Sequence, residues 1–368
     1  MIEVKLSEKL SQCWRMIQGN LFPWLQEELG SLTEKQQKLI TALELTRVEE
    51  FIPRYHGYVG RPQDDRLAIA RAFIAKAVYN MSTTVQLIDR LKCDGVLRRI
   101  CGWEKASSIP SESTFSRVFS EFSSSELAQR LHEALIEKYQ SERLVGHVSR
   151  DSTAIEAREK AATKEKEVKI RKKRGRPRIG EKRLPPEPKR LELQPGMTLV
   201  SMLDDLPKQC DVGTKRNSKG HQESWKGYKL HIDTADGGIP VSAILTSAST
   251  HDSQVAIPLA TMTSQRVVNL YDLMDAGYDA QIIRDHSRSL GHVPLIDFNR
   301  RHENDTRAFM LHEAQRYKER STAERVNARL KDEFGAMMVH VRGHAKVMTH
   351  LMFGIIALTV DQLMRFVT

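Results

Sequence analysis

Four polar side chains at offsets 0, 3, 7 and 14 share the segment YKERSTAERVNARLK, residues 317–331. They are Tyr317, Arg320, Glu324 and Lys331. The segment has no proline or glycine and is rich in helix-favouring residues, which predicts one helix. At about 100° per residue, the four positions fall within about 60° of one another. The apolar residues Val326, Leu330 and Phe334 fall on the opposite side. Taken alone, such a charged face is usually solvated, so a functional interpretation needs partners elsewhere.

Two aspartates supply such partners at the ends of predicted strands. Asp151 ends the apolar segment LVGHVSRD, and Asp275 follows YDLM. Strand ends in α/β sheets are where ligand sites form, because the loops there are free to hold ligands. Together with Glu324 they make three carboxylates, which repel one another unless a cation lies between them. Oxygen ligands suit Mg²⁺, and two such ions can stabilise the attacking and leaving oxygens of a phosphodiester displacement.

Other carboxylates and histidines lie near these positions in the sequence. We interpret Asp252, Asp279 and Asp297 as cap or turn residues, because short acidic side chains bond readily to nearby backbone. His147 and His231 fall within strand patterns, which indicates core histidines.

The elements that position these residues alternate along residues 141–368. The predicted order is a strand at 144–151, a hairpin at 228–246 turning at Gly237–Gly238, a helix at 253–262, a strand at 271–277, a helix at 279–290, a strand at 292–298, and the helix bearing Glu324. This order predicts a mixed α/β fold, with a mixed sheet flanked by helices.

Residues 1–140 predict a separate, all-helical domain. One amphipathic helix carries Asp64 and Asp65 in its first turn, and Ser82 is a plausible N-cap of the next. A third buries an apolar face composed of Phe115, Val118, Phe119 and Phe122. Its other faces carry Ser113, Thr114, Ser116 and Arg117. Two interpretations stay open: a helix-turn-helix that binds DNA through residues such as Arg117, or a bundle that only packs or dimerises.

The charge of the chain is concentrated in one segment. The formal net charge is +10, and residues 157–190 hold 15 basic and 5 acidic residues, which accounts for all of it. The four cysteines form no C-x-x-C pair, so a zinc site or a disulfide framework is not indicated. The N-terminus has no signal-peptide pattern, and the apolar run at 351–360 is short for a membrane span. We therefore expect a cytoplasmic protein with a core helix there and no membrane partner.

The basic segment contains Arg174, Gly175, Arg176 and Pro177. This sequence resembles the core of an AT-hook, in which arginines follow the negative potential of a narrow A·T-rich minor groove and glycine permits close approach. Nonspecific phosphate binding by a polycation is the alternative, and a disordered basic linker is the plainest interpretation. We predict a disordered insert at about 157–208.

The motifs DST, DAGYD and Y-x2-R-x3-E-x6-K together resemble the DDE transposases of bacterial insertion sequences, in the group with a Tyr-Arg-Glu-Lys signature. The segments WKGYKLHI, TSASTHDSQVAIPL and VRGHAKVMTHLMFGIIAL extend this resemblance over most of the chain. The resemblance implies an RNase-H-like catalytic domain in which Asp151, Asp275 and Glu324 bind the metal. It also implies that Tyr317, Arg320 and Lys331 contact DNA around the site.

The resemblance further implies an activity and its partners. Such an enzyme binds terminal inverted repeats, cleaves phosphodiester bonds to expose 3′-OH ends, and joins them to target DNA by transesterification. It uses two Mg²⁺ ions, with Mn²⁺ as a substitute, and no small-molecule cofactor. It acts as a homodimer in a synaptic complex and associates with the bacterial nucleoid when bound to DNA. The alternatives are an RNase-H-like nuclease without strand transfer and a domesticated DNA-binding protein.

The spacing of the last two acidic residues differs from that of some relatives. Only 48 residues separate Asp275 from Glu324, so no β-domain is inserted there. Relatives that form a hairpin intermediate often carry such an insertion, and the route of second-strand cleavage therefore stays open.

Overall fold

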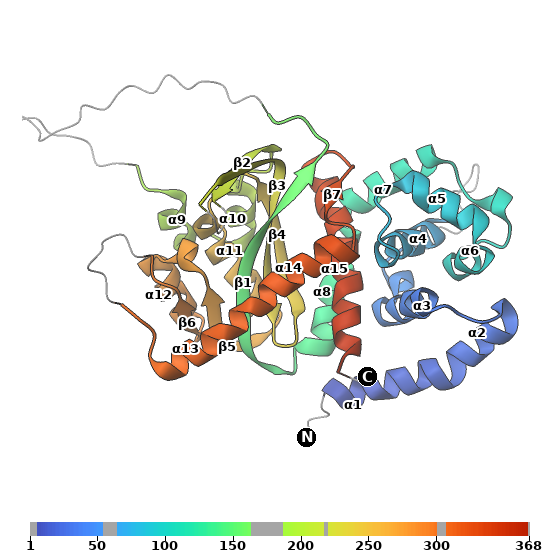
Figure 1. Ribbon diagram of the computed structural model, residues 1–368, viewed down its shortest axis with the longest axis horizontal. Helices are drawn as coiled ribbons and strands as arrows, with labels where there is room; N and C mark the ends of the chain where they lie inside the picture. Colours follow the sequence, from blue (N-terminus) through green and yellow to red (C-terminus); the bar gives the residue numbers. More distant parts are fainter. Residues whose placement is uncertain (1–5, 54–64, 163–186, 217–219, 300–306, 367–368) are drawn as a thin grey trace, which may run out of the picture.

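A computed structural model describes residues 6–53, 65–162, 187–216, 220–299 and 307–366 (Figure 1). Helices occupy the chain up to residue 140. They are α1 (Leu6–Met16), a π-helical segment (Ile17–Leu21), α2 (Phe22–Leu29), α3 (Glu34–Thr46), α4 (Arg66–Val78), α5 (Thr84–Cys93), α6 (Gly95–Cys101), α7 (Glu112–Ser124) and α8 (Leu127–Gln140), with 3₁₀ turns at Val48–Glu50 and Ala106–Ser108.

Side-chain caps begin four of the described helices, α3, α4, α5 and α6, and the sequence predicted caps for α4 and α5. Asp65 accepts hydrogen bonds from the backbone N–H groups of Leu67, at 2.9 Å, and Ala68, which confirms the predicted start of α4. Asp64 lies outside the described residues. The prediction of Ser82 as the cap of α5 was wrong by one residue. Thr83 caps that helix, because only its side chain reaches the N–H of Gln86 in a reciprocal capping box.

Helix α7 presents the predicted apolar face to the core. Phe115, Val118, Phe119 and Phe122 are all buried. Thr114, which was expected on an exposed face, is also buried, because it lies next to the apolar stripe. Arg117 is exposed and donates a hydrogen bond to the Thr114 hydroxyl. A DNA-reading role for this helix remains a prediction.

The rest of the described chain forms a seven-stranded mixed sheet with helices on both faces, as the sequence predicted. The strands are β1 (Leu144–Ala157), β2 (Asp211–Arg216), β3 (Gln222–Ala235), β4 (Ile239–Ser247), β5 (Val268–Met274), β6 (Val293–Ile296) and β7 (Met338–Val339). The helices are α9 (Arg190–Leu193), α10 (Leu199–Asp205), α11 (Ala256–Ser264), α12 (Gln281–Ser289), α13 (Leu311–Tyr317), α14 (Ser321–Glu333) and α15 (His344–Met364). The 3₁₀ turns are Gln194–Gly196, Asp252–Gln254, Ala276–Tyr278 and Lys318–Arg320.

Two long strands organise the sheet. The order is β2-β3-β1-β5-β6, with β4 also pairing β3 and β7 also pairing β1. β3 runs antiparallel to β1, β2 and β4, whereas β5 runs parallel to β1 and β6. The predicted hairpin is β3–β4, and Gly237 and Gly238 make its turn with φ of 81° and 75°. Strand β2 was not predicted, because it is a short edge strand with several polar residues.

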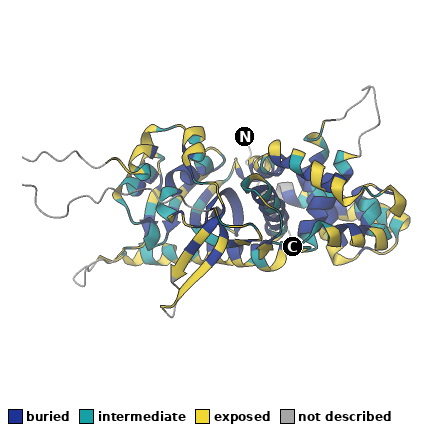
Figure 2. Cartoon of the chain, turned by 90° about the horizontal axis from the view of Figure 1, so that it is seen from above, coloured by how far each residue is buried: buried dark blue, intermediate teal, exposed yellow. Residues whose placement is uncertain are grey.

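Helix α15 packs against α4, α7 and α8 on one side and against β4 and α14 on the other. Figure 1 shows it between the sheet and the N-terminal helices. Among the described residues it is long and apolar enough to cross a membrane, but it is mostly buried within the protein, as expected of a core helix. Figure 2 shows that buried residues concentrate in the strands and in the helices against them. All four cysteines are free.

The predicted bounds of the disordered insert, 157–208, were too broad, because residues at both ends belong to the folded structure. Its C-terminal part folds into α9 and α10, and Met202 is buried there. At its other end, the Ala162 N–H donates to the Cys210 carbonyl at 2.7 Å. The Arg174–Pro177 sequence lies outside the described residues.

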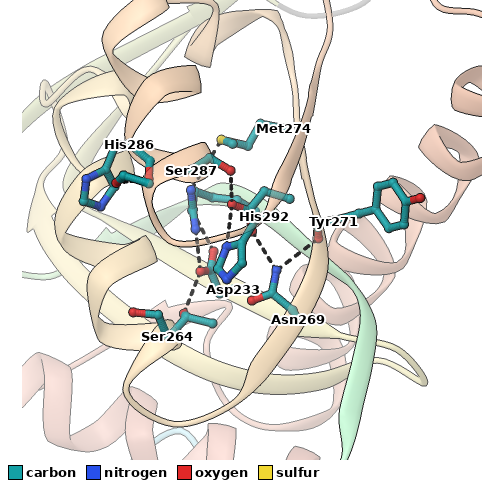
Figure 3. Close-up of polar contacts among 12 residues, drawn as sticks. Asp233, Ser264, Asn269, Tyr271, Met274, His286, Ser287 and His292 are labelled. Atoms are coloured by element: carbon teal, nitrogen blue, oxygen red, sulfur yellow. Dashed lines mark hydrogen bonds and ion pairs between the residues drawn. The ribbon is translucent and has the colours of Figure 1, made fainter.

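A buried polar cluster lies on the sheet face opposite α14. Arg150 donates two hydrogen bonds to Asp233, at 2.8 and 2.7 Å, and both side chains are almost fully buried. The Thr263 hydroxyl of α11 donates to the same carboxylate at 2.7 Å. Figure 3 shows Asp233 close to Met274, whose sulfur accepts from Arg150 Nη1 at 3.4 Å. The cluster therefore connects β3, β1, β5 and α11.

Replacing Arg150 by methionine is expected to lower the free energy of unfolding by about 3–5 kcal/mol, because it leaves the Asp233 charge buried and unpaired. The measurement is urea denaturation followed by circular dichroism. Adding Asp233→Leu should recover most of the loss.

The matched control is Arg288→Met, which removes an exposed ion pair with Asp285. Its expected cost is less than about 1 kcal/mol. Equal costs for the two arginines would contradict the assigned role of Arg150.

Candidate active site

Parallel pairing of β1 with β5 brings the first two acidic residues together. Arg150 of β1 is the register partner of Met274 of β5. Asp151 is the next residue of β1, and Asp275 directly follows β5. The prediction that the first strand ends at Asp151 was wrong, because β1 continues to Ala157 by pairing with β3 and β7. Side chains alternate between the two faces of a strand. Because Arg150 and Met274 point toward the polar cluster, the two aspartates point to the other face, which α14 covers.

Asp151 is largely buried at this position. The Asn327 amide of α14 donates to its Oδ2 at 2.9 Å, and the Ser152 backbone contributes another hydrogen bond. Burial, and then the nearby Asp275 carboxylate, raise the pKa of Asp151 to about 6. The environment therefore disfavours an uncompensated negative charge.

Asp275 is held by the turn that follows β5. Its Oδ1 accepts from the Gly277 N–H at 2.9 Å. A Cβ atom at Gly277 would lie 3.0 Å from that oxygen, so the turn leaves little room for a side chain there. Burial, and then the charge of Asp252, raise the pKa of Asp275.

Arg320 joins the third acidic residue to the first. Its guanidinium donates to the Glu324 carboxylate, and its Nη1 lies 4.0 Å from Asp151 Oδ1. Asp275 also contributes to the electrostatic environment of Arg320. One guanidinium thus lies among all three predicted carboxylates, whereas the sequence predicted that it would contact phosphate.

The segment 317–331 is less regular than the single helix that was predicted. Helix α13 ends at Tyr317, a 3₁₀ turn covers Lys318–Arg320, and α14 follows. The tighter turn advances about 120° per residue, which places Tyr317 and Arg320 in line. The Arg320 guanidinium accordingly lies 6.0 Å from the centre of the Tyr317 ring. The apolar residues Val326, Leu330 and Phe334 are buried as predicted.

Tyr317 supports the end of β5. Its hydroxyl donates to the Met274 carbonyl at 3.1 Å, and its ring packs against Phe309 with centroids 4.8 Å apart. Burial raises the pKa of Tyr317 to about 12. The phenol therefore stays neutral and fixes the residue that precedes Asp275.

Lys331 lies half-buried two turns beyond Glu324. Burial, and then the charge of Lys215 on β2, lower the pKa of Lys331. Among the described residues, no carboxylate lies within salt-bridge distance of Lys331. Lys215 is paired with Glu223 at 3.6 Å, so Lys331 is the lysine at this edge that is open to an anion.

Asp252 lies behind the turn that holds Asp275 and is the first residue of a 3₁₀ turn, which agrees with the turn role among the two predicted, cap or turn. The His251 side chain caps the 3₁₀ turn Asp252–Gln254, because its ring nitrogen accepts from the Ser253 N–H. Asp252 instead pairs with Lys229 Nζ at 3.2 Å, and its Oδ2 lies 3.9 Å from the Cβ position of Gly277.

Asp279 and Asp297 have the predicted turn roles, since they accept from the N–H groups of Asn299 and Phe298. His231 is a core residue, as predicted, with its Nε2 3.0 Å from the Thr246 hydroxyl. His147 is not in the core, because it forms a half-buried pair with Asp236 at 3.0 Å.

Asn327 is the site residue that sequence reasoning missed. It follows Glu324 by three residues, so it lies one turn along on the same side of α14. A search for amides at that spacing would have found it. Asn327 lies at the border between the charged face and the buried stripe, where an amide is easily interpreted as structural.

The fit of the site to a divalent cation follows from its donors. Among the residues the structure describes, no three His, Cys, Asp or Glu side chains are arranged to hold a metal ion. Mg²⁺ is usually bound by one or two carboxylates, with waters and substrate phosphates as the other ligands. Asp151 and Asp275 match that requirement, and their raised pKa values show that positive charge between them is favourable. The residues present therefore fit such an ion.

Comparison with known proteins identifies the family. Residues 146–360 match the family described as "Transposase DDE domain", and residues 26–121 match "Transposase domain (DUF772)". No curated protein and no solved structure matches the chain. The mixed sheet with flanking helices agrees with the RNase-H-like fold of DDE transposases. Because the first match covers more than half of the sequence and includes Asp151, Asp275 and Glu324, the chain belongs to the DDE transposase family.

Proposed function

We propose that this protein is a metal-dependent DNA transposase that binds terminal inverted repeats, cleaves phosphodiester bonds to expose 3′-OH ends, and joins those ends to target DNA. The observation that carries the proposal is the register of β1 and β5, which places Asp151 beside Asp275 beneath the helix bearing Glu324. Strand-transfer products from a supercoiled target are the test that separates this function from that of a nuclease.

The three carboxylates are the proposed metal ligands. Bound Mg²⁺ would polarise the scissile phosphate and lower the pKa of the attacking hydroxyl or water. Asp151 and Asp275 supply fixed ligands, because each accepts a hydrogen bond from the protein. Glu324 is about half exposed and is paired with Arg320, so it can turn toward the metal when Arg320 leaves. The chemistry then needs no protein nucleophile.

Arg320 and Lys331 are the proposed phosphate contacts. Arg320 compensates the carboxylates before DNA binds, and a phosphate can replace Glu324 as its bidentate partner. Lys331 provides a further positive charge, and Lys215, which is paired with Glu223, lies near it. Tyr317 contributes by holding the end of β5, and its ring is a candidate surface for a base near the cut.

Two parts of the proposed DNA interface lie farther from the carboxylates. Arg117 is exposed on α7, where it can reach a duplex if the N-terminal helices bind the repeats. The segment 163–186 contains Arg174, Gly175, Arg176 and Pro177. On one side of it, the Ala162 N–H donates to the Cys210 carbonyl. On the other side, Arg190 donates to the Gln254 side chain at 2.5 Å. Gln254 is two residues from Asp252, so the segment rejoins the fold beside the site. The protein would act in the bacterial cytoplasm, on the nucleoid.

Each of Asp151→Asn, Asp275→Asn and Glu324→Gln is expected to lower the rate of cleavage of repeat-end DNA by more than about 100-fold. Residues that only hold a metal ligand in place typically change activity by less than that. Repeat binding in Ca²⁺ should persist, because the DNA contacts remain. Gel assays of cleavage and binding measure both, with the exposed Asp285→Asn as control. Wild-type cutting by Glu324→Gln would remove Glu324 from the site.

Two protein copies are expected in the complex that joins DNA ends, because strand transfer at both ends of one element needs two active sites. Mass photometry of the complex with paired repeat ends measures this. A single copy on a single end, still able to carry out strand transfer, would refute the prediction.

Replacing Arg174 and Arg176 by lysine should selectively weaken binding to A·T-rich duplexes, because charge is kept while the planar guanidinium groups are lost. The matched control exchanges Lys172 and Lys173 for arginine. Titrations of A·T-rich and G·C-rich duplexes at equal salt give the affinities. Deleting residues 163–186 should reduce the salt slope by about 0.9 for each phosphate that the protein no longer neutralises. An unchanged preference for A·T-rich DNA after the replacement of Arg174 and Arg176 would contradict minor-groove binding. The segment would then be a nonspecific polycation or a linker.

A further inference from the structure

The amide of Asn327 is committed to one oxygen of Asp151. Asn327 lies on α14 with about 6 % of its surface exposed, and its Nδ2 donates to Asp151 Oδ2 at 2.9 Å. The other oxygen of Asp151, Oδ1, lies 4.0 Å from Arg320 Nη1. The two oxygens therefore have different surroundings, one facing a neutral donor and the other facing the position occupied by positive charge.

The chemistry of the donor distinguishes Asn327 from a simple ion-pair partner. A lysine or arginine at this position would neutralise Asp151 and compete with a cation. An amide orients the carboxylate and leaves its full negative charge available. Carboxylates that bind metals are commonly held in this way by a second hydrogen-bonding residue.

Among the described residues, the side chain of Asn327 makes one hydrogen bond, the one to Asp151. The Asn327 carbonyl oxygen is buried and has no hydrogen-bond partner among the described residues. A buried acceptor without a partner lowers the stability of the folded protein. An apolar residue here would extend the stripe formed by Val326 and Leu330, which are both buried. The unpartnered oxygen of the amide therefore lowers stability, and the hydrogen bond from its nitrogen to Asp151 is the contact that offsets this cost.

We propose that Asn327 is a positioning residue that holds Asp151 Oδ2, so that Oδ1 is presented to the divalent cation of the active site. This inference rests on the proposed function, because it assumes that Asp151 binds a metal. Asn327 itself touches neither the metal nor DNA.

The chain provides a closely matched control. Asn269 on β5 is also buried, donates its Nδ2 to an aspartate, Asp272, at 3.0 Å, and has a buried carbonyl oxygen without a partner among the described residues. Its Nδ2 also donates to the Tyr271 carbonyl at 3.3 Å. It lies near the start of β5, whereas Asp275 follows the end of that strand. Asn327→Leu and Asn269→Leu therefore remove the same kind of hydrogen bond, one at the site and one away from it.

The decisive measurement is Mn²⁺ binding to the protein without DNA, followed by electron paramagnetic resonance. Asn327→Leu is expected to weaken Mn²⁺ affinity about 10–100-fold, whereas Asn269→Leu should bind like the wild type. The Mg²⁺ concentration that gives half-maximal cleavage should rise in parallel, with much of the rate recovered at saturating Mg²⁺. Thermal unfolding in EDTA should show both variants folded and similarly destabilised. If Asn327→Leu does not fold, Asn327→Ala takes its place.

Wild-type Mn²⁺ affinity in a folded Asn327 variant would overturn the inference, and so would equal losses in the Asn327 and Asn269 variants. Either result leaves the proposed function intact if the wild type binds Mn²⁺ and cuts repeat ends. A wild-type protein that binds Mn²⁺ but does not cut would refute the proposed function alone. The Mn²⁺ affinities of the Asn327 and Asn269 variants would still decide the role of Asn327. A wild type that binds no Mn²⁺ overturns the inference about Asn327, and one that in addition does not cut repeat ends in Mg²⁺ overturns the proposed function as well.

Discussion

The buried guanidinium of Arg150 joins three neighbouring strands at the point where the two aspartates occur. It donates to Asp233 of β3 and to the sulfur of Met274 of β5. Although burial acts to lower it, the Asp233 carboxylate keeps the pKa of Arg150 above its ordinary value. A buried charge pair tolerates little change in geometry, because the loss of either partner leaves the other charge buried and unpaired. The residues that follow Arg150 and Met274 are Asp151 and Asp275, so this contact also sets the spacing of the proposed site.

The opposite face of the sheet carries the acidic residues, whose negative charges are compensated by Arg320. Asp151 and Asp275 have raised pKa values because they are buried close to other carboxylates. Arg320 compensates them from a tightened helical turn, where it can exchange Glu324 for another anion. A rigid ion pair on one face and an exchangeable one on the other suit the proposed binding of both cations and DNA at this site.

Helix α15 extends this rigidity to the N-terminal helices. It packs on β4 and α14 and also on α4, α7 and α8. A helix that is apolar on all sides must be buried on all sides, which explains why both parts of the chain share one hydrophobic cluster. Contacts made by the N-terminal helices with DNA would therefore be transmitted to a sheet that cannot easily shift.

Local patterns in the sequence were enough to predict most elements of the catalytic region in their order, the buried stripe of α14, and Asp275 at the end of a strand, whereas Asp151 lies within β1 and not at its end. These features depend on periodicity and on residues near in the chain. Which side chains meet depends instead on the folded chain. Asn327 and Asp151 are 176 residues apart, and Asp252 approaches the Asp275 turn from a different loop. The orientation of Arg320 toward carboxylates likewise depends on a 3₁₀ turn. Such contacts come from strand register and helix placement, which no local pattern of residue types encodes.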